Sequence, residues 1–100
     1  MAFIFDPEKN ERNIQERGLS FERVAEMDWD TALIAEDTRR EYGERRYRVF
    51  ALLDKRLHIA AITPRGEDIR VISFRKANRK EELMYEREKA RRQGPESRTH

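Results

Sequence analysis

The chain has 100 residues, of which 42% are charged and 37% belong to the hydrophobic set. This length predicts one domain with a modest core. No apolar run approaches the roughly 20 residues that a membrane-spanning helix needs, so we expect no membrane segment. The sequence contains no cysteine, which excludes disulfides, thiolate catalysis and zinc–thiolate sites and fits a reducing compartment such as the cytoplasm.

The formal net charge of +2 conceals an asymmetry along the chain. Residues 1–42 carry 6 Lys/Arg and 11 Asp/Glu, whereas residues 43–100 carry 16 and 9. The two signs could still mix in space, and a charged run is commonly just a solvated face. If they do not mix, the second half offers a basic surface for phosphates.

The first 26 residues are predicted to contain a short strand and two helices. Residues 2–5 could form the strand. Asp6 is a suitable N-cap, and Gly18 a suitable stop, for a helix over about residues 7–17. Ser20 can cap a second short helix.

The middle of the chain changes character. Residues 31–35 fit either a strand or a buried connection, and the charged residues 36–44 fit a loop. Residues 45–53 show the alternation of a strand. One face would carry Tyr47, Val49, Ala51 and Leu53, and the other Arg46, Arg48, Phe50 and Leu52.

Two more strands follow at close spacing. Residues 54–55 are a plausible tight turn, although they lack the glycine that a two-residue hairpin prefers. Residues 56–63 form the next predicted strand, residues 64–66 a turn, and residues 68–75 a third clear strand.

The C-terminal segment is predicted to be helical. Asn78 followed by Glu81 resembles a capping box, so the helix spans about residues 78–92. The pair Gly94-Pro95 would end it. We therefore expect one domain over residues 1–93 and a flexible tail over residues 94–100.

The order of the elements predicts an α+β fold, because no strand–helix–strand alternation is visible. We expect a curved antiparallel sheet with two N-terminal helices and one C-terminal helix. The sheet face that the helices leave partly open, if it carries basic residues, is the expected place for function.

Several kinds of site are unsupported. The two histidines, His58 and His100, are far apart, and His58 in an apolar strand is best explained as a satisfied, half-buried residue. The four glycines stand alone, so no phosphate loop is present. The acidic cluster of Asp28, Asp30, Glu36 and Asp37 matches no metal-binding motif. We predict no cofactor and no metal.

The basic residues between positions 65 and 80 are more informative. They are Arg65, Arg70, Arg75, Lys76, Arg79 and Lys80. The guanidinium fork matches phosphate, and the helix start near Asn78 adds free backbone N–H groups. Phe74 and Tyr85 offer aromatic surface that could stack a base. Together these features predict a site for RNA phosphates.

Strand geometry limits this site. Strict alternation places Arg70 and Arg75 on opposite faces of their strand. Both can serve one site only if a β-bulge intervenes or if one side chain reaches round an edge.

Such a site could cleave RNA without a metal ion, because the 2′-hydroxyl of RNA is an internal nucleophile. Arginines can stabilise the charge of the transition state. Lys76, Tyr85 and Glu44 are candidates for the proton transfers. Glu81 is expected to cap its own helix instead.

Two separated blocks of the sequence resemble the BrnT-type toxins. The first is Phe3-x-Phe5-Asp6-Pro7-Glu8-Lys9-Asn10-x-x-Asn13 with Gly18-Leu19-Ser20-Phe21-Glu22. The second is Gly43-Glu44-x-Arg46, then Thr63-Pro64-Arg65-Gly66-x-x-Ile69-Arg70-Val71-Ile72-Ser73-x-Arg75-Lys76-Ala77, with Glu81 and Tyr85. The resemblance covers about residues 3–85.

The resemblance implies an endoribonuclease toxin of a type II toxin–antitoxin pair with a RelE-like fold. It also implies a BrnA-type antitoxin, a small DNA-binding protein that inactivates the toxin, so that operator DNA is contacted only through the complex. Related enzymes work without metal and use arginine, lysine, tyrosine or glutamate side chains on a sheet face.

The distribution of basic residues and the resemblance to BrnT-type toxins together define the expected site. We expect catalysis from Arg65, Arg70, Arg75, Lys76, Glu44 and Tyr85. We expect RNA contacts from Lys9, Ser73, Phe74, Arg79 and Lys80.

One position departs from the family pattern. Relatives usually have Lys-His-Gly before the second helix, where this chain has Glu16-Arg17-Gly18. Arginine does not release its proton, so Arg17 cannot replace a histidine base. The alternative is therefore a weak or inactive relative that acts as an RNA-binding module or as a co-repressor with its antitoxin.

The last helix has few aliphatic side chains to hold it, namely Leu83, Met84 and Ala90. We expect the antitoxin to contact this helix or the adjoining sheet face, and the mobility of the helix to fall on binding.

Overall fold

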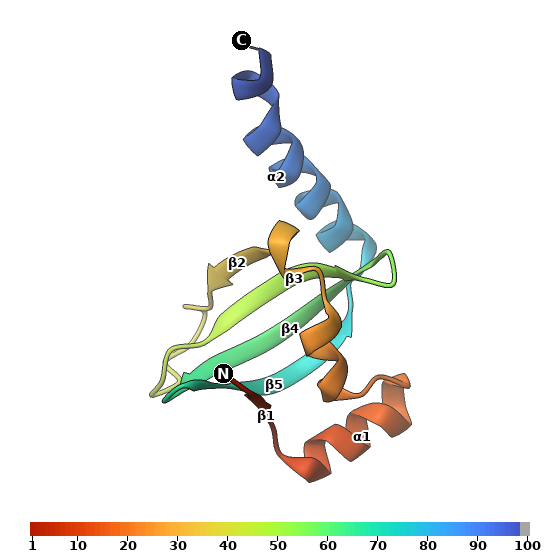
Figure 1. Ribbon diagram of the computed structural model, residues 1–100, viewed down its shortest axis with the longest axis vertical. Coiled ribbons are helices and arrows are strands. Elements are labelled where there is room, and N and C mark those ends of the chain that lie inside the picture. The colour runs from red at the N-terminus through yellow and green to blue at the C-terminus, as the bar shows by residue number, and fades with distance from the viewer. Residues whose placement is uncertain (99–100) are drawn as a thin grey trace.

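Five strands form one curved, mixed sheet in the order β1-β5-β4-β3-β2, with helices at both ends of the chain (Figure 1). The computed structural model describes residues 1–98, with side chains as far as Gln93. The strands are β1 (Phe3–Ile4), β2 (Leu33–Glu36), β3 (Tyr47–Leu53), β4 (Arg56–Arg65) and β5 (Asp68–Lys76), and the helices are α1 (Pro7–Arg17), η1 (Phe21–Glu26), η2 (Trp29–Thr31) and α2 (Arg79–Arg98), of which η1 and η2 are 3₁₀ helices. The predicted α+β class is confirmed.

We expected a wholly antiparallel sheet, and this expectation is wrong for one pair of strands. The short strand β1 pairs in parallel with β5, with Phe3 opposite Ile69. The Ile69 amide donates to the carbonyl of Ala2 at 2.9 Å, and the Ala2 nitrogen donates to Asp68 at 3.1 Å. A parallel partner can come from far along the chain, so its direction is not encoded in local turn residues.

The start of the chain folds as predicted. Asp6 caps α1 by accepting a hydrogen bond from the Glu8 amide at 2.9 Å, and Gly18 ends it with a φ of 65°. Ser20 caps η1 through the Glu22 amide at 3.2 Å. The additional short helix η2 was not predicted.

The hairpins differ from expectation in one respect. Asp54 and Lys55 form the predicted tight turn, and both have positive φ, 51° and 66°, although neither is glycine. In the second hairpin Pro64 and Arg65 belong to β4, so the predicted turn over residues 64–66 is wrong. The turn lies at Gly66 and Glu67, because Gly66 adopts the positive φ of 61° that a tight turn requires.

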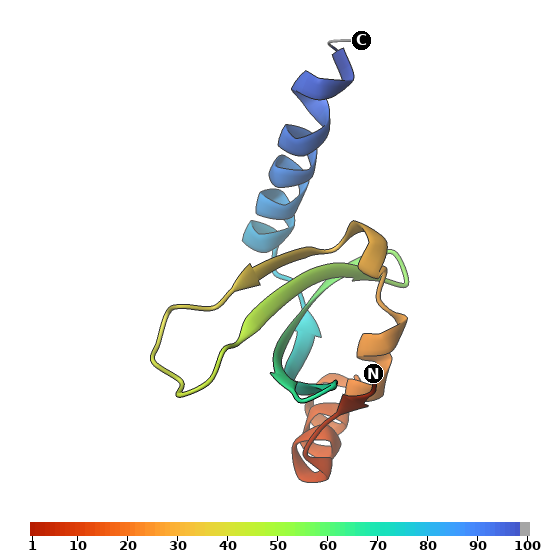
Figure 2. The same cartoon turned by 60° about the vertical axis from the view of Figure 1, so that its left-hand side comes forward.

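The sheet has two faces of different character. The first face carries the larger core, which includes Phe21 and Val24 of η1, Val49, Val71 and Phe74, and the sheet curves around it (Figure 2). The alternation predicted for residues 45–53 is confirmed, since Val49, Ala51 and Leu53 belong to this core. The second face carries a smaller cluster, made of Leu33, Phe50, Leu57, Ile59, Ala77 and Tyr85.

The start of α2 covers only part of the second face, and the rest of the helix extends away from the sheet (Figure 1). The predicted capping box is present: the Glu81 amide donates to Asn78 at 2.8 Å, and the Asn78 amide donates to Glu81 at 2.9 Å. The predicted end at Gly94-Pro95 is wrong, because α2 continues to Arg98. A proline removes one intrahelical hydrogen bond but does not oblige the following residues to leave the helix. Residues 99–100 of the predicted tail lie outside the described residues.

Two asparagines of α1 tie the helix to the sheet and to η1. The amide nitrogen of Asn13 donates to the carbonyls of Leu19 at 2.9 Å and of Phe74 at 3.0 Å. The side-chain oxygen of Asn10 accepts a hydrogen bond from the Phe21 amide at 2.7 Å. The exposed edge of β5 is thereby covered by a helix that has no buried residue of its own.

Asn13→Ala should therefore destabilise the fold. It removes two partly buried hydrogen bonds, each worth about 1 kcal/mol, so we expect a loss of about 2 kcal/mol. Urea unfolding measures this loss. The matched control is Gln15→Ala on the exposed side of α1, for which we expect a change of less than about 0.5 kcal/mol. Equal effects of the two substitutions would contradict the role of Asn13.

Candidate RNA-binding site

A β-bulge in β5 decides which side chains share the second sheet face. Ala61 of β4 pairs with Ser73, but the next residue, Ile62, pairs with Val71. Ile72 is therefore the extra residue of the bulge. One extra residue reverses the alternation beyond it, so that Val71 and Phe74 both point into the same core.

The bulge places Arg70 and Arg75 on the same face of β5. Val71 and Phe74 lie on the first face, so their neighbours Arg70 and Arg75 lie on the second. The alternation expected from the sequence would have separated the two arginines. Strand alternation requires a β-bulge between Arg70 and Arg75 for both to serve one site from the same face, and the structure contains that bulge.

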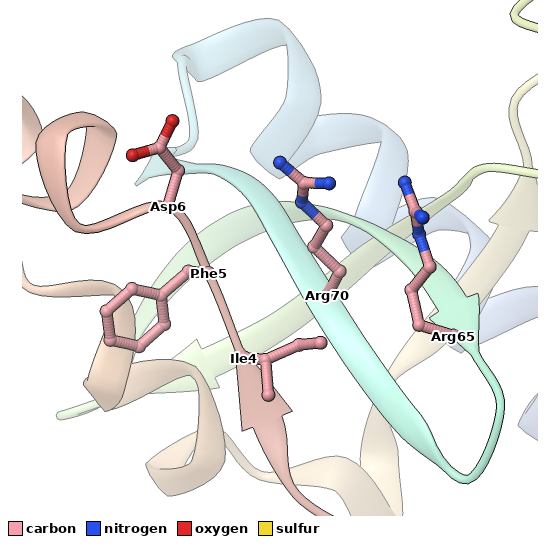
Figure 3. Close-up of a pocket in the computed structure, with 5 residues that line it drawn as sticks. All are labelled: Ile4, Phe5, Asp6, Arg65 and Arg70. Atoms are coloured by element: carbon pink, nitrogen blue, oxygen red, sulfur yellow. The ribbon is translucent and has the colours of Figure 1, made fainter.

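Neighbouring strands add three arginines to this face. Arg65 lies near the end of β4, and Arg46 and Arg48 share the second face with Phe50 of β3. We call this set, Arg46, Arg48, Arg65, Arg70 and Arg75, the arginine face. Figure 3 shows Arg65 and Arg70 rising side by side from β4 and β5, where they line a pocket with Ile4, Phe5 and Asp6.

Glu44 lies between two arginines of this face. One carboxylate oxygen accepts a hydrogen bond from Arg65 at 3.2 Å, and the other accepts one from Arg46 at 3.1 Å. The ring of Tyr42 lies 4.2 Å from the guanidinium of Arg46. The loop before β3 thus adds a carboxylate and an aromatic ring to the basic surface.

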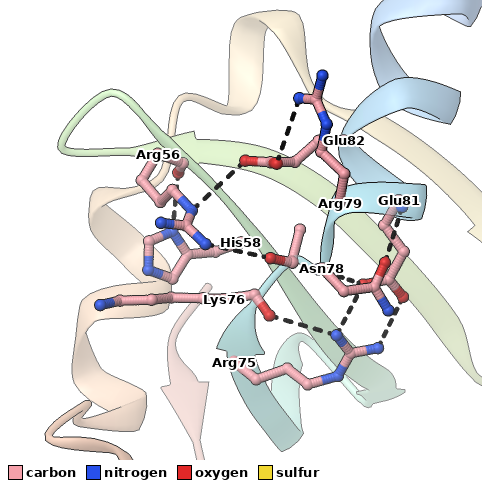
Figure 4. Close-up of polar contacts among 9 residues, drawn as sticks. Arg56, His58, Arg75, Lys76, Asn78, Arg79, Glu81 and Glu82 are labelled. Atoms are coloured by element: carbon pink, nitrogen blue, oxygen red, sulfur yellow. Dashed lines mark hydrogen bonds and ion pairs between the residues drawn. The ribbon is translucent and has the colours of Figure 1, made fainter.

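Arg75 is held by a glutamate of α2. Its two terminal nitrogens donate to the two oxygens of Glu81, both at 2.8 Å (Figure 4). The hydrogen bonds from Arg75 lower the pKa of Glu81 to about 2, and Glu81 in turn raises the pKa of Arg75. Because Glu81 also caps α2, one carboxylate fixes both the helix and the arginine.

Two arginines of the face lack such partners. Arg70 forms no ion pair with any residue that the structure describes. The buried Nε of Arg48 finds no hydrogen-bond partner among the residues that the structure describes, and its guanidinium lies 5.4 Å from the ring of Phe50. Both side chains can therefore accept an external anion without breaking an existing ion pair.

Three predicted site residues lie elsewhere. Lys76 pairs with His58 on the first face, and Figure 4 shows its side chain extending away from that of Arg75. Phe74 is fully buried in the core and cannot stack a base. Tyr85 is 7% exposed, and its hydroxyl donates to the carbonyl of Thr31 at 3.1 Å. Burial and the strand register thus remove these three from the arginine face.

The remaining predicted RNA contacts are peripheral. Lys9 and Ser73 line a shallow groove together with Arg12 and Arg17, between α1 and the bulged part of β5. Arg79 is exposed at the start of α2 and lies 3.9 Å from Glu82. Lys80 lines a different groove, beside Arg48.

The sequence reasoning missed Arg46, Arg48 and Tyr42 as site residues. A signal was available for the two arginines, because they alternate with the first-face residues Tyr47 and Val49. Tyr42 had no such signal, since it lies in a loop whose path depends on the hydrogen bond from its hydroxyl to Asp37 at 3.1 Å.

The described residues offer neither a metal site nor a membrane-spanning helix. Among the described residues, no group of three or more His, Cys, Asp or Glu side chains is arranged to hold a metal ion. No helix in the described part of the chain is both long and apolar enough to cross a membrane.

Comparison with protein-family models gives a match over residues 5–81, which is 77 of the 100 residues. The matching family is described as the ribonuclease toxin, BrnT, of type II toxin–antitoxin systems. The chain belongs to the BrnT family. The family implies a toxin with ribonuclease activity, an RNA target and an antitoxin partner. Neither the curated proteins nor the solved structures gave a match.

The matched region contains the whole arginine face and ends at Glu81, shortly after α2 begins. The BrnT assignment expected from the two sequence blocks is confirmed. The RelE-like fold stays a prediction.

The ion pair between Glu81 and Arg75 predicts how stability depends on pH. A lowered pKa in the folded state stabilises the protein above the ordinary glutamate pKa of about 4.3, and this stabilisation is lost as pH falls toward about 2. Glu81→Gln should reduce stability at pH 7, and the difference from the wild type should shrink below about pH 4. Urea unfolding at a series of pH values measures this difference.

The control for this experiment is Glu16→Gln, at an exposed position of α1. Its stability should follow that of the wild type at every pH. Parallel curves for the wild type and Glu81→Gln would contradict the proposed contribution of the ion pair.

Proposed function

We propose that this BrnT protein is a metal-independent endoribonuclease and that the arginine face binds the RNA phosphate at the cleavage point. The observation that supports this is that Arg65, Arg70 and Arg75 lie on the same partly open sheet face, because the bulge at Ile72 brings Arg70 and Arg75 to one side of β5. A set of arginines from adjacent strands presents several donor forks to one polyanion.

Two arginines of the face, Arg70 and Arg65, bind the phosphate in the proposed reaction. Arg70, which has no ion-pair partner among the described residues, donates to the phosphate oxygens. Arg65 does the same from the neighbouring strand and remains oriented by Glu44. As the 2′-oxygen attacks phosphorus, the phosphate gains negative charge, and donors already in place stabilise that charge most.

The reaction also moves two protons. The 2′-hydroxyl loses its proton as the bond from its oxygen to phosphorus forms, and the 5′-oxygen gains a proton as its bond to phosphorus breaks. The products are a 2′,3′-cyclic phosphate and a 5′-hydroxyl end. We assign the first transfer to Glu44, because its carboxylate lies beside Arg65. Lys76 lies on the opposite face of the sheet, and the buried Tyr85 donates its hydroxyl to the carbonyl of Thr31.

The secondary RNA contacts follow from the same geometry. Lys9 and Ser73 lie in the groove along α1 and the bulged part of β5, so a strand of RNA that crosses β5 would reach them. Arg17 lines this groove and adds positive charge there. Tyr42, stacked on Arg46, replaces the buried Phe74 as the candidate for base stacking.

The cellular setting is part of this proposal. We propose a BrnA-type antitoxin that neutralises the enzyme, operator DNA that is bound only through the toxin–antitoxin complex, and a cytoplasmic location. The basis is family membership together with the absence of cysteine.

The second candidate function is an inactive relative that binds RNA or acts as a co-repressor. What favours it is Arg17, which stands where the resemblance to the family implies a histidine. An arginine cannot act as the base there. Incubation of the purified protein with RNA in EDTA separates the candidates, because only the enzyme yields cyclic-phosphate products.

Arg70→Ala should abolish most of the cleavage. Removing one preorganised donor to a developing oxyanion commonly costs about 10²-fold or more in rate. The rate of RNA cleavage in EDTA measures the effect. The matched control is Lys76→Ala, on the same strand but the opposite face, which should keep the wild-type rate within about threefold. A larger loss for Lys76→Ala than for Arg70→Ala would contradict the proposed site.

Glu44→Gln should alter the pH dependence of cleavage. If Glu44 accepts the 2′ proton, the wild-type rate falls at acid pH where the carboxylate is protonated, and the variant lacks this limb. The cleavage rate measured from pH 4 to pH 8 distinguishes this role from simple orientation of Arg65. A variant with lower rates but an unchanged profile would assign Glu44 to positioning only.

A further inference from the structure

The helix α2 carries a stripe of side chains that faces away from its anchor. Lys80, Leu83, Met84 and Arg87 follow the spacing i, i+3, i+4 and i+7, which places them on one side of a helix. They line a groove of about 600 Å³ with Arg48 and Phe50 of β3, Asn78 and Glu81. The groove thus has a sheet strand as its floor and the helix as its wall.

The wall of the groove is apolar and exposed. Leu83 is 44% exposed and Met84 is 43% exposed, in adjacent positions. The other side of the helix is anchored, since Tyr85 and Lys89 both donate to the carbonyl of Thr31. Contiguous exposed apolar side chains with a polar rim are typical of a surface for a protein partner.

The charges around this groove are mostly positive. Arg48 contributes a guanidinium from β3, and Lys80 and Arg87 lie on the helix. The acidic residue that lines the groove, Glu81, is occupied by Arg75 through two hydrogen bonds. An occupant that supplies carboxylates would therefore meet at least three cations.

We propose that this groove is the docking site for an acidic amphipathic helix of the antitoxin. The aliphatic side of that helix covers Leu83 and Met84, and a carboxylate from its polar side binds Arg48. A polypeptide fits better than RNA, because Leu83 and Met84 offer no aromatic surface for bases. This inference rests on the proposed function, in which an antitoxin neutralises the toxin.

The position of the groove also suggests how neutralisation works. Glu81 lines the groove and binds Arg75 of the arginine face, and Arg48 belongs to both surfaces. A helix seated in the groove would occupy Arg48 and lie against the α2 side of the arginine face. RNA and antitoxin would then compete for overlapping surfaces.

The test is a double substitution, Leu83→Glu with Met84→Glu, which places negative charge on the apolar wall and replaces no residue of the arginine face. Binding of the antitoxin encoded in the adjacent reading frame is measured by calorimetry, and RNA cleavage is measured with and without that antitoxin. We expect affinity to fall at least about 30-fold, which corresponds to about 2 kcal/mol. Cleavage without antitoxin should equal that of the wild type.

The matched control is Ile14→Glu, at a residue of α1 that is 38% exposed and distant in sequence from the groove. It should bind antitoxin as the wild type does. A double variant that binds and is inhibited normally would overturn the proposal, as would one that loses RNA cleavage while keeping antitoxin affinity. Failure of the wild type to cleave RNA would instead count against the proposed function, because the binding comparison needs no catalysis.

Discussion

The register of β5 is the constraint on which the arrangement of the basic surface depends. A regular strand would place either Arg70 or Arg75 on the face occupied by η1, where Val71 and Phe74 pack. The extra residue at Ile72 lets the strand keep both core residues and still present both arginines to the second face. The packing of one face and the chemistry of the other are therefore linked through a single irregularity in the backbone.

The second face of the sheet is partly covered by packed side chains and partly open to solvent. Part of it is covered, because Phe50, Leu57 and Ile59 pack against Tyr85 at the start of α2. The rest stays open and carries arginines, of which Arg48 lies against Phe50 of the hydrophobic cluster. The domain can leave part of this sheet face uncovered because the larger core on the first face supplies most of the buried apolar residues.

Glu81 connects the parts of this surface. It caps α2, binds Arg75 with both oxygens and lines the groove beside Arg48. An anion that displaced Glu81 from Arg75 would also disturb the N-terminal cap of the helix. The basic surface and the orientation of α2 are consequently coupled through one side chain, and Glu44 has a comparable position between Arg46 and Arg65.

Local sequence determined a large part of this protein. The caps at Asp6, Ser20 and Asn78, the turn at residues 54–55 and the alternation in β3 depend on neighbouring residues, so their patterns predicted them correctly. The family assignment was likewise available from two sequence blocks. The basic character of the second half was visible from composition alone.

Tertiary structure decided which of the basic residues act together. The bulge at Ile72, the parallel pairing of β1 with β5 and the burial of Phe74 and Tyr85 depend on contacts between residues distant in sequence. No local pattern shows which residue a strand will leave unpaired, because that choice is made by the packing of the facing core. For this reason the sequence could name Arg65, Arg70 and Arg75 but could not separate them from Lys76.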